Sequence, residues 1–395
     1  MSAQPIIPRG FLLSASLCGL KKEGYDLALI VSKTPAHAAG VFTTNKVQAA
    51  PVVLCKKHVR KPIRGIVVNS KNANAVTGVQ GERAALRMAQ ILAEELDAKP
   101  EQMLVASTGV IGQQMPMDKI EKGIRAAVPL LKPEENNAPK AIMTTDKFEK
   151  KIYRQIIIDK TEVRFFAMAK GAGMIHPNMA TMLAFIITDA NIEQGALNAA
   201  LKDVADRTFN RISVDGDTST NDTLLLLANG KAEQPLIKRG SKNFAKFTRT
   251  LYEICEHLAM LMVKDGEGAT KVIKLTVKNA ADKNAATRIA QTIATSSLVK
   301  TAFYGADANW GRILAAAGRA GVKFDPARTT LSINGFTVYR HGKLDRSEED
   351  DLNTAMKRPD QTVILDCGYK TRIHDVYWFS DLTHEYVSVN ADYRT

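Results

Sequence analysis

The sequence predicts an α/β (α+β) fold of layered sheets covered by helices. Short apolar segments rich in β-branched residues alternate along the chain with segments whose apolar residues recur at helical spacing. Some neighbouring strand segments are joined by short turns, which indicates β-hairpins rather than a purely parallel strand order. The length of 395 residues fits two or three domains, or one large fold in two parts.

Within residues 1–180 the elements are expected in the following order. Strands are predicted where a short apolar run is rich in β-branched residues: Asp26–Ser32, Pro51–Lys56, Gly65–Asn69 and Leu104–Ala106. Helices are predicted over two longer stretches, Thr77–Leu96 and Asp118–Leu131. In the first of these, Met88, Ile91 and Leu92 fall on one side at helical spacing.

A β-hairpin is predicted near residue 160. The runs Ile152–Ile158 and Glu162–Met168 are apolar and rich in β-branched residues, and a short gap separates them. The turn passes through Asp159 and Lys160, although it lacks the glycine that such turns usually contain.

Residues 181–395 continue the alternation and end in strands. Strands are predicted first at Thr181–Ile187, Leu224–Leu227 and Lys271–Val277. Helices are predicted at Gln194–Thr208, Ser241–Val263, Ala286–Ser296 and Trp310–Gly318. The C-terminal part predicts three further strands, Thr362–Cys367, Arg372–Trp378 and Tyr386–Val389.

The composition is that of an ordinary soluble protein, with 45% hydrophobic and 24% charged residues. The longest apolar runs are far shorter than the roughly 18 residues that a membrane span needs. The four cysteines are scattered without a CxxC pair, which argues against a zinc ribbon or a dithiol redox site. We therefore expect reduced thiols and a cytoplasmic location. No targeting segment is predicted, because Leu17 before Cys18 does not fit a signal-peptide cleavage site.

The chain is basic, with a net charge of +13. Most of the excess lies in residues 1–180, which hold 26 basic and 15 acidic residues. A nucleic-acid-binding protein is one hypothesis from this charge. However, no aromatic residues interleave with the basic run Lys56–Lys61, and no helix-turn-helix, RNP or zinc-finger spacing accompanies it. A solvated basic surface is favoured, and the charge would also attract small anionic substrates.

The segment Lys170–Thr181, with the sequence KGAGMIHPNMAT, is the most distinctive local feature. Its two glycines allow unusual backbone conformations, a proline fixes the loop, and a threonine opens an apolar strand. It is not a dinucleotide fingerprint, because the third glycine is missing and a strand follows. The pattern alone favours a glycine-rich turn that leads into a core strand.

The chemical alternative is an N-terminal nucleophile. If the bond before Thr181 is cut, Thr181 gains a free α-amino group beside its own hydroxyl. That amine has an ordinary pKa of roughly 7.7–8.0, so it can act as a base near neutral pH and activate the hydroxyl. The small Ala180 would help the loop reach the geometry of an acyl shift.

Metal binding is not predicted. The run Asp215–Asp222 resembles a calcium-binding loop, but Thr220 stands where the turn needs glycine, and Leu226 where a bidentate glutamate is needed. His374 and His384 have no third ligand nearby in the sequence.

Nine motifs together resemble the ornithine acetyltransferase family of arginine biosynthesis, whose bifunctional members also make N-acetylglutamate from acetyl-CoA. They span nearly the whole chain, in order and at similar spacing: Ala39–Asn45, Val67–Asn74, Ser107–Gly112, Ile142–Asp146, Lys170–Thr181, Ser213–Asp222, Asp265–Lys271, Gly305–Arg312 and Asn390–Thr395. Three residues depart from the family pattern. Lys71 and Ala172 stand where glycine and serine are usual, and Val76 where cysteine is common.

The resemblance implies an N-terminal-nucleophile-type acyltransferase with the ornithine acetyltransferase fold. Thr181 matches the nucleophile, and the self-cleavage site lies between Ala180 and Thr181. Thr108 and Gly109 match the oxyanion hole, a hydroxyl and a backbone N–H. The substrate-binding positions that match are Thr144, Lys170, Thr181, Glu267, Asn390 and Thr395. A cation and hydroxyls suit the carboxylate of an amino acid, and a carboxylate suits its ammonium group.

The implied function is transfer of an acetyl group from N2-acetylornithine to glutamate through an acetyl-threonine intermediate. No cofactor is implied, and acetyl-CoA is a second donor to be tested. Cleavage would give an α chain of residues 1–180 and a β chain of residues 181–395, with two of each in a heterotetramer. No nucleic acid or membrane partner is expected. The alternative from the same chemistry is an N-terminal-nucleophile amidase or aminopeptidase, in which water replaces glutamate.

Overall fold

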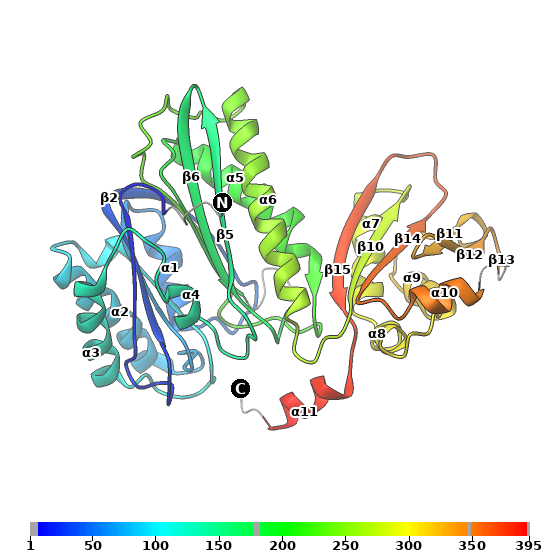
Figure 1. Cartoon of the computed structure of the whole chain (residues 1–395), viewed down its shortest axis with the longest axis horizontal. Helices are drawn as coiled ribbons and strands as arrows, with labels where there is room; N and C mark the ends of the chain where they lie inside the picture. Colours follow the sequence, from blue (N-terminus) through cyan, green and yellow to red (C-terminus); the bar gives the residue numbers. More distant parts are fainter. Residues whose placement is uncertain (1–6, 177–181, 346–348, 393–395) are drawn as a thin grey trace. The chain divides into compact units, whose positions relative to one another are not determined.

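The computed structural model describes residues 7–176, 182–345 and 349–392 (Figure 1). Two compact units can be distinguished. The first comprises Met1–Asn210 and Asp217–Ala259, and the second comprises Arg211–Gly216 and Met260–Arg394. Each unit holds one β-sheet. These units are not the predicted α and β chains. Those chains are divided at the cleavage site, which lies within the span of the first unit.

The first unit contains an eight-stranded sheet with the order β4-β3-β2-β9-β7-β6-β5, in which β1 also pairs with β2. Its strands are β1 (Phe11–Ser16), β2 (Leu27–Phe42), β3 (Ile63–Asn69), β4 (Met103–Ser107), β5 (Lys150–Ile158), β6 (Thr161–Lys170), β7 (Leu183–Thr188) and β9 (Thr223–Ala228). The strands β9 and β7 thus come from the part after residue 181 and lie between β2 and β6.

The long strand β2 links the two halves of this sheet. Its first half pairs with β1 and β3, and its second half pairs with β9. The register between β2 and β3 shifts between Val31 and Ala36, where Pro35 lies. A proline cannot donate to a ladder and is tolerated at such an irregularity. One hydrophobic core contains residues from both halves, among them Ile30 and Phe185.

Helices cover both halves of the sheet. The helices α2 (Gly78–Glu95) and α3 (Met117–Ala127) pack through Met88 and Ile124 against the half that contains β3 and β4. On the other half, α5 (Gln194–Arg207) contacts β2, and Phe247 of α6 (Lys242–Lys264) lies 5.3 Å from Phe165 of β6 between ring centroids. The remaining helical segments of this unit are α1 (Ala50–His58), η1 (Pro100–Gln102), η2 (Val128–Leu130), α4 (Ala138–Ala141) and η3 (Phe209–Arg211).

The second unit contains a seven-stranded sheet with the order β13-β12-β11-β14-β10-β15-β8. Its strands are β8 (Ile212–Ser213), β10 (Val272–Lys278), β11 (Thr330–Ile333), β12 (Phe336–Arg340), β13 (Lys343–Leu344), β14 (Asp360–Asp366) and β15 (His374–Ser380). Its helical segments are α7 (Lys283–Ala294), α8 (Ser297–Tyr304), α9 (Trp310–Gly318), η4 (Pro326–Arg328), α10 (Glu349–Ala355) and α11 (His384–Asp392).

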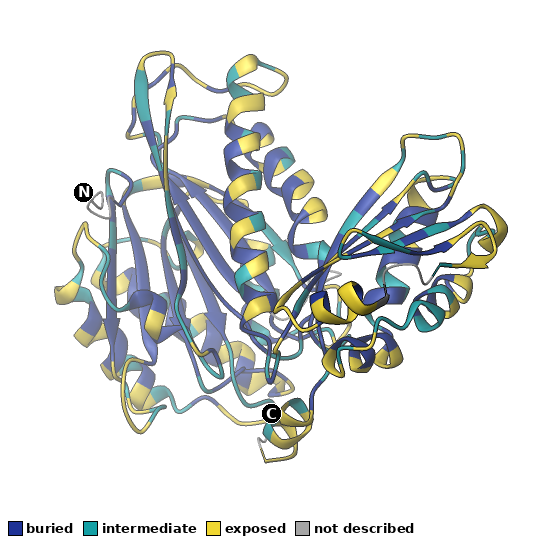
Figure 2. Cartoon of the chain, turned by 45° about the vertical axis from the view of Figure 1, so that its right-hand side comes forward, coloured by how far each residue is buried: buried dark blue, intermediate teal, exposed yellow. Residues whose placement is uncertain are grey.

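In this second sheet, α7, α8 and α9 pack on one face through residues such as Ile289 and Phe303. Along β14 buried and exposed residues alternate, and Figure 2 colours the sheets and their covering helices by burial. Such alternation is typical of a sheet with one covered face. The two units together confirm the predicted class, with mixed sheets covered by helices.

Most predicted elements are present with shifted ends. The hairpin β5–β6 turns at Asp159 and Lys160, which both have positive φ, 46° and 68°. Two consecutive residues at positive φ are the backbone that a two-residue hairpin turn requires, so the turn forms without glycine. The strand predicted from Thr181 is β7, whose described part begins at Leu183.

The strand predicted at Pro51–Lys56 is wrong, because this segment belongs to helix α1. Pro51 lies in the first helical turn, where its missing N–H costs nothing. The basic residues Lys56 and Lys57 lie in the last turn, where they complement the helix dipole. The valines favoured a strand, whereas the buried positions Val52 and Cys55 are three residues apart, as on one side of a helix.

The strand predicted at Tyr386–Val389 is also wrong, because this segment lies in helix α11. The Thr383 hydroxyl accepts a hydrogen bond from the Tyr386 N–H at 3.2 Å, which is an N-terminal helix cap. Glu385 in the first turn favours the same helix start. The alternation of Val387 and Val389 with polar residues favoured a strand but did not determine the structure.

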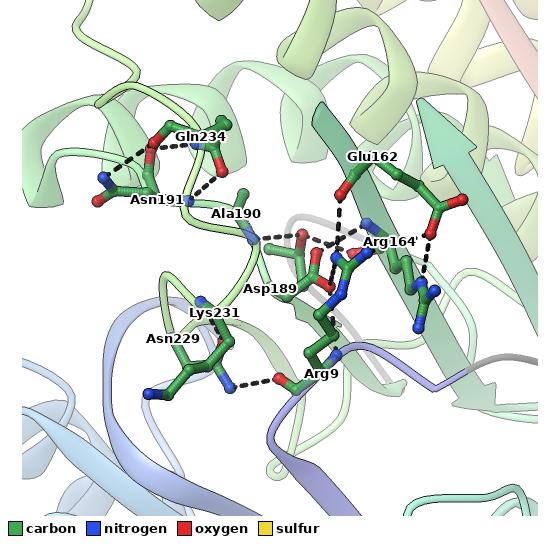
Figure 3. Close-up of polar contacts among 10 residues, drawn as sticks. Arg9, Glu162, Arg164, Asp189, Ala190, Asn191, Asn229, Lys231 and Gln234 are labelled. Carbon is green, nitrogen blue, oxygen red and sulfur yellow. Dashed lines mark hydrogen bonds and ion pairs between the residues drawn. The ribbon is translucent and has the colours of Figure 1, made fainter. Parts of the chain in front are cut away.

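The far end of β7 is held by a buried carboxylate, Asp189 (Figure 3). Asp189 accepts hydrogen bonds from the main-chain N–H groups of Arg9 and Arg164, and its partner in an ion pair is the Arg9 guanidinium at 2.8 Å. This cluster anchors the N-terminal segment to the sheet.

Candidate active site

The segment Lys170–Thr181 connects two neighbouring strands of the first sheet. The strand β6 ends at Lys170, which is paired with Leu183 at the start of β7. Ala180 and Thr181 themselves lie outside the described residues. Met182, the next residue, is buried, and its N–H donates to Oδ1 of Asp222 at 2.7 Å. Both flanks of the predicted cleavage site are therefore fixed in the sheet.

Thr108 and Gly109 lie directly after β4. The Thr108 N–H donates to the Asn69 carbonyl at 3.1 Å. Gly109 has φ +135°, and a Cβ there would lie 2.1 Å from the carbonyl carbon of Lys71. This position therefore requires glycine. Both residues remain partly exposed, so the Thr108 hydroxyl and the loop backbone can be reached by a small molecule.

The loop that carries Thr108 is held by Asn221, which precedes β9. Its side-chain amide donates to the Ser107 carbonyl at 2.8 Å and to the Ala73 carbonyl at 2.6 Å. The next residue, Asp222, binds the N–H of Met182. Two consecutive residues thus connect the predicted oxyanion loop to the chain that follows Thr181. The sequence motif Ser213–Asp222 contains both, but no role was predicted for either.

Lys170 connects the end of β6 to the oxyanion loop. Its side chain is 4% exposed, and its Nζ donates to the Thr108 hydroxyl oxygen at 3.3 Å. Because this oxygen accepts from an ammonium group, the hydroxyl keeps its own proton for donation. The positive charge also polarises the hydroxyl toward donation.

Asp146 joins two of the predicted substrate-binding positions. Its carboxylate accepts from the Thr144 N–H at 3.0 Å, from the Gly171 N–H at 2.7 Å and from the Lys150 ammonium at 2.6 Å. Burial by itself would raise the pKa of Asp146, but the positive charges of Lys170 and Lys150 outweigh it and lower the pKa to about 2. An ionised Asp146 thereby fixes Thr144 and the residue after Lys170. It was not among the predicted site residues.

We expect Asp146→Asn to lower the free energy of unfolding at pH 7 by at least about 2 kcal/mol, because each unit of pKa shift corresponds to ~1.4 kcal/mol. The pKa of Asp146 is lower in the folded chain than in the unfolded chain, so the ionised carboxylate stabilises the fold above the unfolded pKa of 3.8. This stabilisation is lost as the pH falls toward 2. Denaturant titrations at pH 7 and pH 3 measure this. Glu149→Gln, in a more exposed ion pair with Lys151, is the control and should cost less than about 1 kcal/mol. An equal loss for Asp146→Asn at both pH values would contradict the prediction.

Glu267 and Asn390 come together in the second unit. The Asn390 amide donates to Oε2 of Glu267 at 2.9 Å, although 123 residues separate them. The backbone brings them close, because the Thr383 hydroxyl donates to the Gly268 carbonyl at 2.8 Å. A Cβ on Gly268 would lie 2.4 Å from the N atom of Tyr386. Two of the predicted substrate-binding residues thus lie together, although no contact between them was predicted, and Thr395 lies outside the described residues.

A cavity of about 390 Å³ in the second unit is lined by Asp307, Trp310 and Phe336, among others, and by none of the predicted site residues. Within residues 7–176, 182–345 and 349–392, no group of three or more His, Cys, Asp or Glu residues could hold a metal ion. In the same residues, no helix combines the length and apolarity that crossing a membrane requires.

Comparison with known proteins identifies the family. The ArgJ family model matches residues 12–395. The chain belongs to the ArgJ family. The arginine biosynthesis bifunctional protein ArgJ of Symbiobacterium thermophilum is 45% identical over 393 residues, which cover 98% of each chain. The protein of the same name from Thermotoga neapolitana is 46% identical over 396 residues, which cover 98% of this chain and all of that one.

A solved structure agrees with this assignment. The crystal structure of the arginine biosynthesis bifunctional protein ArgJ from Bacillus halodurans matches with a TM-score of 0.51 and 38% identity. The match covers 53% of this chain and 98% of the solved chain. The family predicted from the motifs is thereby confirmed, and with it the general function, an acyltransferase of arginine biosynthesis.

Two of the residues expected to depart from the family pattern, Lys71 and Val76, lie on strained backbone. Lys71 has φ 74° and Val76 has φ 56°, both in the left-handed region that favours glycine. Lys71 carries the carbonyl against which Gly109 packs. A glycine would adopt this left-handed backbone without strain, whereas this chain places a lysine there.

We expect Val76→Gly to raise the free energy of unfolding by about 1 kcal/mol. A β-branched residue is strained at positive φ, and the 65% exposed side chain gives up little burial when removed. Val79 is 62% exposed but lies in helix α2, so Val79→Gly is the matched control and should lower the same quantity. Denaturant unfolding measures both, and a loss of stability in Val76→Gly would show that the strain is unimportant.

Proposed function

We propose that the chain is a glutamate N-acetyltransferase that moves the acetyl group of N2-acetylornithine to glutamate through an acetyl ester on Thr181. The observation that carries the proposal is the junction at Asn221 and Asp222. Asn221 holds the loop of Thr108 and Gly109, while Asp222 holds Met182, the residue after Thr181. The predicted oxyanion donors and the predicted nucleophile are therefore tied to the same two residues.

In the first half-reaction, the Thr181 hydroxyl attacks the acetyl carbonyl of N2-acetylornithine, and the α-amine of Thr181 takes the hydroxyl proton. The Thr108 hydroxyl and the Gly109 N–H donate to the negatively charged oxygen of the tetrahedral intermediate. The contact with Lys170 leaves the Thr108 proton available for this. The C–N bond then breaks, the α-ammonium returns the proton to the departing amine, and ornithine leaves.

In the second half-reaction, the amine of glutamate attacks the acetyl-threonine ester. One proton of that amine passes to the α-amine of Thr181 and from there to the threonine oxygen as the ester bond breaks. N-acetylglutamate leaves and the free hydroxyl is restored. Because both acetyl carriers are α-amino acids, the same carboxylate-binding groups serve both half-reactions.

Substrate recognition is assigned to groups of complementary charge. The Lys170 ammonium suits a substrate carboxylate, and Thr144, fixed by Asp146, adds a hydroxyl. Glu267, held by Asn390, suits a substrate ammonium group. Thr181 and Thr395 complete the six proposed binding positions.

Self-cleavage between Ala180 and Thr181 would supply the free amine. The length of the Bacillus halodurans chain supports this. The match covers 98% of that chain but only 53% of this one, so that chain is about half as long as this one. We further propose a cytoplasmic heterotetramer of two α and two β chains, with acetyl-CoA as a second acetyl donor.

The test is an exchange assay on the purified protein. N2-acetylornithine and acetyl-CoA are supplied separately, each with and without glutamate, and ornithine, coenzyme A, N-acetylglutamate and acetate are quantified. We expect N-acetylglutamate from N2-acetylornithine, and ornithine in equal amount. N-acetylglutamate from acetyl-CoA would establish the second donor. Acetate in place of N-acetylglutamate would overturn the transferase proposal in favour of an amidase.

A further inference from the structure

Asp222 is a buried carboxyl group for which the reaction described above has no use. Its side chain is 1% exposed. Oδ1 accepts the N–H of Met182 at 2.7 Å, and its main-chain carbonyl accepts the N–H of Thr43 at 3.0 Å. Since Met182 follows Thr181 by one peptide bond, Asp222 fixes the chain immediately next to the predicted nucleophile.

The second oxygen of this carboxyl, Oδ2, is buried and has no hydrogen-bond partner among the described residues. The Thr43 hydroxyl lies beside the carboxyl, but it donates its proton to the Ser219 carbonyl at 2.7 Å. A buried polar oxygen without a partner is costly and uncommon in folded proteins. Such an atom next to a predicted cleavage site suggests a partner that the uncut chain does not yet possess.

The charges around Asp222 are few. Burial raises its pKa well above the ordinary value, while the Met182 N–H, the positive charge of Lys170 and the neighbouring Thr43 hydroxyl oppose this rise. Lys170 on β6 is the charged side chain that acts on Asp222 within the described residues, and Thr43 and Met182 on the neighbouring segments are uncharged. In the uncut chain the carboxyl therefore tends to keep its proton.

We propose that Asp222 is a positioning residue for Thr181: Oδ1 fixes the peptide that follows the nucleophile, and Oδ2 receives the ammonium group that cleavage creates on Thr181. This inference rests on the proposed self-cleavage. It adds a carboxylate partner for the amine base, because Glu267, the carboxylate among the predicted site residues, is assigned to the ammonium group of the substrate.

Hydrolysis of the Ala180–Thr181 bond by one water molecule leaves a carboxylate on Ala180 and an ammonium group on Thr181. Asp222 then loses its proton to solvent and pairs with that ammonium group. Loss of one proton from the ammonium group gives the free amine that acts as the base. When the hydroxyl of Thr181 attacks, its proton re-forms the ammonium group beside the Asp222 carboxylate, which stabilises it.

A carboxylate next to an amine favours the charged ammonium form and raises the pKa of the amine. Asp222→Asn keeps an acceptor for the Met182 N–H but removes the negative charge. We expect this variant to be cleaved, and the acidic limb of its kcat/KM profile to move to lower pH by about one unit. Turnover at the optimum should fall about tenfold, because a base whose pKa is one unit lower is tenfold weaker.

Asp189→Asn is the matched control, because Asp189 is a buried carboxyl at the other end of β7 that also accepts main-chain N–H groups (Figure 3). It should leave the acidic limb unchanged. An Asp222→Asn enzyme that is cleaved and has the wild-type pH profile would overturn the proposal. A wild-type chain that stays uncut or makes no N-acetylglutamate would instead refute the proposed function.

A measurement on the unaltered enzyme keeps the test independent of how the variants fold. The rate at which the Thr181 α-amine reacts with an amine-specific reagent, followed against pH by mass spectrometry of the β-chain N-terminus, gives the pKa of that amine. We expect a value above the ordinary range of roughly 7.7–8.0. A value below that range would contradict a carboxylate partner.

Discussion

The purified protein is expected to run on a denaturing gel as two chains of about 19.7 and about 23.5 kDa, residues 1–180 and 181–395, rather than as the intact 43.2 kDa chain. The amine base of the proposed mechanism does not exist in an uncut chain. The structure fixes the chain on both sides of the cleavage site, through Lys170 paired with Leu183 and through Met182 bound to Asp222. Such anchoring reduces the conformational cost of bringing the Thr181 hydroxyl to the Ala180 carbonyl.

Thr181→Ala should remain a single chain and lose all exchange activity, because it lacks the hydroxyl for both reactions. Thr181→Ser keeps a hydroxyl and is the matched control, which should be cleaved, although at a different rate. Edman sequencing of the second chain of the unaltered protein should give Thr-Met-Leu as its first three residues. An active enzyme that remains intact on the gel would refute the N-terminal nucleophile.

Thr108→Val should lower kcat by roughly 10²–10³, the loss typical of one oxyanion-hole donor. Valine has nearly the shape of threonine, so the loop held by Asn221 should keep its conformation. KM should change little, because the donor acts on charge that develops only in the transition state. Self-cleavage should slow as well, since it passes through a similar intermediate.

Thr108→Ser is the control, because it restores a hydroxyl next to the Lys170 ammonium and should recover most of the turnover. Kinetics are measured on chains whose cleavage has gone to completion, so that slow processing is not mistaken for slow catalysis. Wild-type turnover in fully cleaved Thr108→Val would remove Thr108 from the oxyanion hole.

The sequence allowed the family, the class of fold and the sheet-and-helix alternation to be predicted, because motifs and hydrophobic periodicity are local. The two strands wrongly predicted at α1 and α11 have β-branched residues, and in each case the helix start is set by a single residue, Pro51 or Thr383. Intrinsic strand preference is weak enough for such signals to override it.

The residues that hold the candidate site together were harder to predict. Asn221 acts on Ser107, which is 114 residues away, and Asp222 acts on Met182, 40 residues away. Nothing in the local pattern distinguishes them from the other polar residues of a loop. Their roles follow from sheet order, which places β9 beside β7 and β2. Asp146 likewise gains its role from Lys150 and Lys170, which meet it only in the folded chain.

If the chain is cut as proposed, the position of β7 and β9 between β2 and β6 determines how the two fragments stay together. Both fragments contribute strands to one continuous sheet, so neither can leave without breaking two rows of backbone hydrogen bonds and opening a shared core. Dilution alone will therefore not separate them, whereas denaturant will. Once they are apart, reassembly becomes a bimolecular fragment complementation, and its yield will depend on protein concentration, unlike the refolding of the uncut Thr181→Ala chain.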